Sequence, residues 1–132
     1  MSNAIVLDEK QTTEIADKLA QASNQVLELR IALTDRTPPT PSAVLHDLKQ
    51  YESQLDQMVS FFRAHGIYLI NQGAQQALAN VNAAIEQGRK TVADIKHTHA
   101  AIKAAAGLLD LAAALLSRNP LTIAEAANSL RS

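Results

Sequence analysis

The chain has 132 residues and a formal net charge of −1, with 47% hydrophobic and 19% charged residues, a composition typical of a globular domain rather than a disordered segment. It contains no cysteine, which excludes disulfides, thiolate metal sites and cysteine nucleophiles. Its 12 Lys and Arg residues are dispersed and only 3% of residues are aromatic, so neither the basic patch nor the stacking platform of a nucleic-acid-binding protein is expected.

The first predicted helix covers residues 8–33. Asp8, followed three residues later by Gln11, is typical of a capping box at a helix N-terminus. Apolar residues then recur at alternating steps of four and three, the spacing of a heptad seam: Ile15, Leu19, Ala22, Val26, Leu29 and Leu33. A proline-rich loop over residues 34–40 ends this helix, because proline is excluded from a helix interior.

The second predicted helix covers residues 41–64 and begins at Pro41, since proline is favoured at the first helical position. The same heptad spacing recurs in it, at Val44, Leu48, Tyr51, Leu55, Met58 and Phe62. Gly66 follows and suits the left-handed conformation that often ends a helix. We therefore expect the two helices to pack against each other along their seams.

The third predicted helix covers residues 67–117, because apolar residues from Leu78 to Leu116 keep one unbroken spacing of three and four. A turn between two helices would normally reset that phase, so we expect one continuous helix of about 70 Å. The alternative is a turn near Gly88, with Thr91 as the N-cap of a fourth helix. That alternative would give a four-helix up-down bundle.

A short helix over residues 123–130 is predicted to end the chain. Thr122 and Glu125 before and within it have the spacing of a capping box. We therefore expect one all-α domain over residues 1–132, an antiparallel bundle or coiled coil of three long helices plus this short one. If the third helix is split near Gly88, the bundle has four helices of similar length.

His97 and His99 resemble a metal-binding pair, but residues two apart on a helix point about 200° apart. They cannot hold one ion together, so we expect no metal ligand and no cofactor. His99 falls on the predicted seam, where a polar residue can fix helix register or make the packing pH-sensitive.

The sequence shows no phosphate-binding loop or nucleophile motif, so we expect no catalytic residues and no small-molecule substrate.

The stretch from Ile102 to Leu116 is more apolar than a single seam requires. Lys103 and Asp110 interrupt it, so a membrane-spanning helix is not expected. A helix that is apolar on most sides is buried on most sides, and the first two helices are too short to cover the predicted third one. We therefore predict an interface with another helix or a second copy, formed by Ile102, Leu109, Leu111, Leu115 and Leu116.

These patterns predict a non-enzymatic helical interaction or assembly module that acts through apolar heptad seams. Its expected partner is itself, as a homodimer, or another helix. The N-terminus lacks the basic and apolar regions of a signal peptide, so a cytoplasmic location is expected. The alternative function is that of a membrane-active helical protein that inserts residues 102–116.

Overall fold

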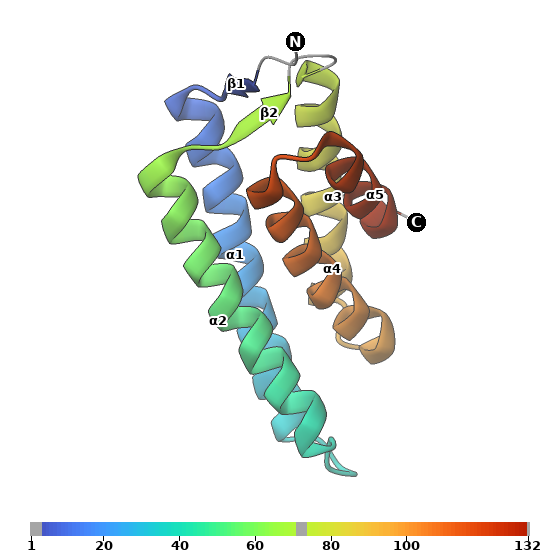
Figure 1. The fold of residues 1–132 in the computed structure, drawn as a ribbon. Coiled ribbons are helices and arrows are strands. Elements are labelled where there is room, and N and C mark those ends of the chain that lie inside the picture. The colour runs from blue at the N-terminus through green and yellow to red at the C-terminus, as the bar shows by residue number, and fades with distance from the viewer. Residues whose placement is uncertain (1–3, 71–73, 132) are drawn as a thin grey trace.

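The computed structural model describes residues 4–70 and 74–131. This part of the chain is almost entirely helical, which confirms the all-α class, and Figure 1 shows its five helices. They are α1 (Glu9–Thr34), α2 (Ser42–His65), α3 (Ala74–Ala93), α4 (Thr98–Ser117) and α5 (Pro120–Arg131).

Two short strands, which no sequence pattern predicted, lie at the open end of the α1–α2 hairpin. One precedes α1 and the other follows α2. Strand β1 (Ala4–Val6) pairs antiparallel with β2 (Tyr68–Ile70). Next to this pair, the backbone N–H of Leu7 donates to the Ile67 carbonyl at 2.8 Å. Leu7 and Ile67 are both buried, so the strand pair closes one end of the core.

Helices α1 and α2 match the predicted bounds to within one residue. The capping box is confirmed, because the Asp8 carboxylate accepts from the Gln11 backbone N–H at 2.7 Å and the Gln11 side chain accepts in return at 3.2 Å. All six seam residues of α1 are buried. In α2 every second seam residue is fully buried, namely Leu48, Leu55 and Phe62, and those between them are half-buried.

The prediction of one continuous helix over residues 67–117 is wrong. Helix α3 ends at Ala93 and α4 begins at Thr98, while residues 71–73, which the prediction also included, lie outside the described residues. The alternative misplaced the turn, since Gly88 lies inside α3 and the chain turns at 94–97. There the His97 backbone N–H donates to the Asp94 carbonyl at 3.1 Å, and the two side chains meet at 2.8 Å.

The unbroken apolar spacing across this turn does not correspond to one continuous buried face. Val92 is the last buried residue of the α3 seam, and the next expected seam residue, Ile95, is 47% exposed. Helix α4 instead buries the face that carries Ala101, Ala105, Leu108, Leu111 and Leu115. The turn therefore resets the phase of the apolar spacing. This stabilises the fold, because the more continuous apolar face of α4 enters the core.

The helices form two hairpins, α1–α2 and α3–α4, that pack side by side, with α5 against α3 and α4 (Figure 1). Helices that follow one another within a hairpin are antiparallel. Helices α1 and α3 are parallel, since Lys18 contacts Asn82 and, seven residues or about two turns further along both helices, Gln25 contacts Arg89. The arrangement therefore differs from a simple up-down bundle, in which every pair of neighbours is antiparallel.

Helix α5 begins earlier than predicted, at Pro120. Its N-cap is Asn119, whose side-chain oxygen accepts from the backbone N–H groups of Leu121 at 3.0 Å and Thr122 at 3.3 Å. The predicted capping role of Thr122 is therefore wrong, because Pro120 already occupies the favoured first helical position. Ile123, Ala127 and Leu130 form its buried apolar face.

Candidate interaction surface

The five residues predicted to form an interface all lie on α4, but the chain itself buries two of them. Leu111 and Leu115 lie in the core. Ile102 and Leu109 are half-buried, and Leu116 is 40% exposed. Sequence periodicity did not separate these two groups because apolar residues cover more than one face of α4. Of the five, therefore, only Ile102, Leu109 and Leu116 are placed to contact a second molecule.

Ile102, Leu109 and Leu116 lie seven residues apart, so they share one edge of α4. This edge borders α2, because Ile102 and Val44 of α2 line the same surface hollow and the two helices are in contact. Helices α2 and α4 also run parallel, since Tyr68 beyond the end of α2 contacts Arg118 at the end of α4. The α4 edge is therefore one wall of a shallow seam between the two hairpins.

Helix α2 supplies the other wall. Glu52 of α2 pairs with Arg30 of α1, and Arg63 of α2 pairs with Asp17 of α1. Glu52 and Arg63 therefore mark the side of α2 that faces α1, away from this seam. Phe61 follows Glu52 by nine residues, which places it on the opposite side of the helix, and it is 41% exposed.

Tyr51 and Met58 lie between the core face of α2 and Phe61 and are half-buried. We call the six residues of the two walls the apolar strip: Tyr51, Met58, Phe61, Ile102, Leu109 and Leu116. Sequence reasoning missed Phe61 because the heptad pattern assigned the neighbouring Phe62 to the seam, and Phe62 is indeed buried. An adjacent pair of large apolar residues was the signal that two faces of α2 are apolar.

The predicted seam position of His99 is wrong. His99 is exposed in the first turn of α4, because the turn before this helix shifts the phase of its buried face. It lines an open hollow beside the proline-rich loop, where the Arg36 guanidinium donates to the Thr98 hydroxyl at 3.0 Å. A solvated histidine on this rim does not set helix register in the core.

The described residues contain no group of three or more His, Asp or Glu side chains that could hold a metal ion. His97 pairs with Asp94 across the turn at 2.8 Å. Both side chains are exposed, and the contact closes the turn between α3 and α4. We therefore assign it a structural role.

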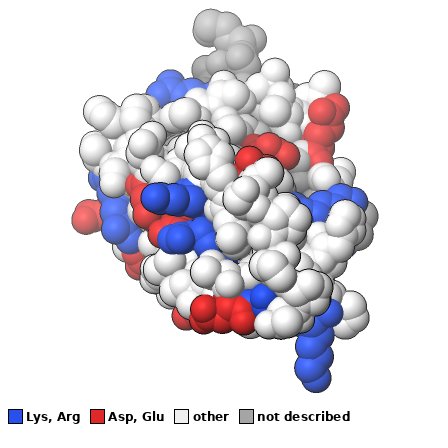
Figure 2. Space-filling view, turned by 90° about the horizontal axis from the view of Figure 1, so that it is seen from below, with Lys and Arg blue, Asp and Glu red and all other residues white. Residues whose placement is uncertain are grey.

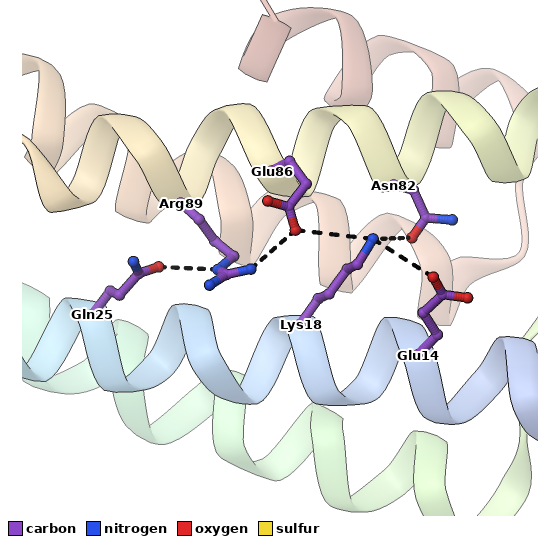
Figure 3. A network of polar contacts seen from close by, with 6 residues as sticks. All are labelled: Glu14, Lys18, Gln25, Asn82, Glu86 and Arg89. Atoms are coloured by element: carbon purple, nitrogen blue, oxygen red, sulfur yellow. Dashed lines mark hydrogen bonds and ion pairs between the residues drawn. The ribbon is translucent and has the colours of Figure 1, made fainter.

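A network of polar contacts joins α1 to α3 (Figure 3). Its members are Glu14, Lys18, Gln25, Asn82, Glu86 and Arg89. The Glu86 carboxylate lies between two cations, 2.9 Å from Arg89 and 3.9 Å from Lys18. Lys18 also donates to Asn82 at 3.3 Å, and Arg89 to Gln25 at 3.2 Å. Each member has a partner inside the network, which aligns the two hairpins.

The charges at the surface are mixed. Seen from the end that carries the α1–α2 loop, Lys and Arg side chains are interspersed with Asp and Glu, and uncharged areas separate them (Figure 2). A field of one sign, as a nucleic acid or an acidic membrane would require, is not visible on this face. On this face, therefore, charge does not mark a binding site.

Among the described residues, one helix, α4, is long and apolar enough to cross a membrane by length and composition. The two charges that interrupt it are too few to exclude this, contrary to the expectation from sequence. Of its most apolar window, 44% is buried in the fold. A core helix of a soluble protein passes the same test, so the property alone is weak support for a membrane role.

Searches of protein-family models, of curated protein sequences and of solved structures each found no match to this chain.

Proposed function

We propose that this protein is a non-enzymatic assembly module that self-associates as a homodimer through apolar helix surfaces. The observation that carries the proposal is the apolar strip, in which Phe61 and Leu116 remain substantially exposed after folding. Large apolar side chains left exposed on a folded chain favour association, because their hydration costs free energy that association recovers. We expect the module to act in the cytoplasm.

A second copy is the occupant that this surface favours. A two-fold dimer places the same patch of each copy against the other, so the patch must complement itself. The strip favours such pairing, because its side chains are uncharged and mostly apolar on both walls, so that no like charges of the two copies would meet. A homodimer would shield both exposed strips with one interface.

The test replaces Leu116 or Phe61 by Glu and measures absolute mass by light scattering over a range of concentrations. A carboxylate at either position would have to be desolvated in the dimer, so we expect the dimer dissociation constant to rise at least tenfold while the circular dichroism spectrum stays native. Ala83→Glu is the matched control, because Ala83 is exposed on α3, a helix that carries no residue of the strip. A native chain that is monomeric at all concentrations would contradict the proposal.

The second candidate function, insertion of α4 into membranes, is favoured by the length and apolar composition of that helix. Insertion would require α4 to leave the core, where Leu108 and Leu111 are fully buried. Flotation with neutral and with anionic lipid vesicles separates the two functions. An assembly module stays in solution with both, whereas a membrane-active protein floats with at least one.

A further inference from the structure

Helix α5 fits a groove between α3 and α4 that two glycines make. A methyl group on Gly107 would lie 2.8 Å from Leu130 Cδ2, and one on Gly88 would lie 3.1 Å from the same atom. Leu130 therefore occupies space that exists only because both facing helices carry glycine at this level. The groove is shaped for the side chain that fills it.

Helix α5 packs against both α3 and α4. Three side chains, Ile123, Ala127 and Leu130, are buried against the hairpin, and Arg131 donates to Asn80 at 3.1 Å. The α5 helix of a second copy can make every one of these contacts equally well, because it has the same sequence. An exchange of α5 between two copies therefore loses none of them.

The connection between α4 and α5 is short and strained. Only Arg118 and Asn119 separate the two helices, and Arg118 has a φ of 62°, in the left-handed region that non-glycine residues avoid. The closed chain needs this conformation to fold α5 back onto α4. Short hinges under strain favour exchange, because an open hinge relaxes the strain.

The hinge is flanked by exposed apolar side chains. Leu116 precedes it and is 40% exposed, and Leu121 follows it and is 66% exposed, the most of any large apolar residue among those described. In an exchanged dimer the two hinges run beside each other near the two-fold axis. The leucines of the two copies can then bury one another there, which is a contact that the closed monomer lacks.

We propose that the homodimer forms by exchange of α5, so that the α5 of each copy occupies the glycine-lined groove of the other. This inference rests on the proposed self-association and specifies its mechanism. The groove contacts are the same in monomer and dimer. Burial of Leu116 and Leu121 favours the dimer, in addition to burial of the rest of the apolar strip. Relief of strain at Arg118 adds to these terms where the guanidinium keeps its contact with Tyr68.

The first test mixes two single-cysteine chains, Gly107→Cys and Leu130→Cys. Because the native chain has no cysteine, a disulfide between these chains requires the α5 of one to reach the groove of the other. A Cβ at residue 107 would lie 3.3 Å from Leu130 Cγ, which is close enough for a disulfide across the groove. After co-incubation and mild oxidation, we expect disulfide-linked heterodimers on denaturing gels, confirmed by mass spectrometry of the joined peptides.

The matched control pairs Gly107→Cys with Ala124→Cys, which places the second thiol on the exposed side of α5. We expect this pair to cross-link at least tenfold more slowly. Equal rates for the two pairs would overturn the exchange.

The second test uses a chain with no core substitution, lengthened by Gly-Ser-Gly-Ser between Arg118 and Asn119. A long hinge lets α5 close onto its own chain without strain, so we expect the dimer dissociation constant to rise at least tenfold. An unchanged dissociation constant overturns the exchange. A native dimer that fails either test would refute exchange but leave self-association standing, whereas a native chain that never dimerises would refute both proposals.

Discussion

The guanidinium of Arg118 lies over the ring of Tyr68, with 3.9 Å between Cζ and the ring centroid. The contact joins the end of α4 to β2, and it holds a residue whose backbone has the left-handed φ of 62°. A cation–π contact at an exposed site stabilises by about 0.5–1 kcal/mol. The left-handed backbone of a non-glycine residue costs a similar amount, about 1 kcal/mol. The two effects nearly cancel, so Arg118 stabilises the fold little.

Substitutions at Arg118 should therefore reverse the usual order of Ala and Gly. Arg118→Ala loses the ring contact and keeps the strained backbone, whereas Arg118→Gly loses the contact and relieves the strain. We expect the Gly variant to be more stable than the Ala variant by about 1 kcal/mol, measured by urea unfolding at a concentration where the chain is monomeric.

The control lies inside α4, where Ala113 is exposed. Ala113→Gly should lower the free energy of unfolding by about 1 kcal/mol, the ordinary helix penalty of glycine. If Arg118→Ala were the more stable of the two variants at residue 118, the backbone strain inferred there would be wrong.

Close packing of α5 against Gly107 gives a second prediction. Gly107→Ala should gain up to about 1 kcal/mol in helix propensity but lose about 1–3 kcal/mol by overpacking against Leu130, with a net loss of stability. In a Leu130→Ala background the clash is absent, so the same substitution should stabilise. Thermal unfolding of the four chains of this cycle measures the coupling. Equal effects of Gly107→Ala in both backgrounds would show that Leu130 does not fill the space.

The α1–α2 hairpin could be predicted from sequence because its signals are local. Asp8 with Gln11 marks where α1 begins, the prolines mark its end, and the heptad spacing identifies the buried face. These signals depend on residues within a few positions of each other. They hold regardless of how the rest of the chain folds.

The α3–α4 turn could not be predicted, because no glycine or proline marks it and the apolar spacing crosses it unbroken. Gly88, the residue that looked like a turn, is needed inside α3 to admit Leu108 and Leu130. This role depends on its contacts with Leu108 and Leu130, which lie 20 and more positions away in the sequence. The positions of His99 and of the buried Leu111 followed from the same unpredicted turn, since it alone sets the phase of α4.

The capping box of α1 gives a third prediction. Asp8→Ala removes the acceptor of the Gln11 backbone N–H and should lower the free energy of unfolding by about 1 kcal/mol. Asp8→Asn should retain most of the stability, because the amide oxygen can accept the same hydrogen bond. Urea unfolding of the three chains measures both effects. Similar losses for Ala and Asn would mean that charge, rather than capping geometry, stabilises this end.

The Arg30–Glu52 and Arg63–Asp17 pairs both join α1 to α2, but they differ in burial. The first pair is mostly buried, with 3.2 Å between Nη2 and Oε2, whereas both partners of the second are more than half exposed. Arg30 Nε is also a buried atom with no hydrogen-bond partner, so the arginine depends on Glu52 to compensate its charge.

Glu52→Ala should therefore cost about 1.5–3 kcal/mol, because it leaves a largely buried cation without its charged acceptor. Asp17→Ala should cost less than about 1 kcal/mol, since water replaces the lost contact. Urea unfolding at low and at high salt provides the comparison. Salt should reduce the small Asp17 effect further and leave most of the Glu52 effect, because screening acts on solvated charges. Equal losses in the two variants would mean that burial does not set the strength of these contacts.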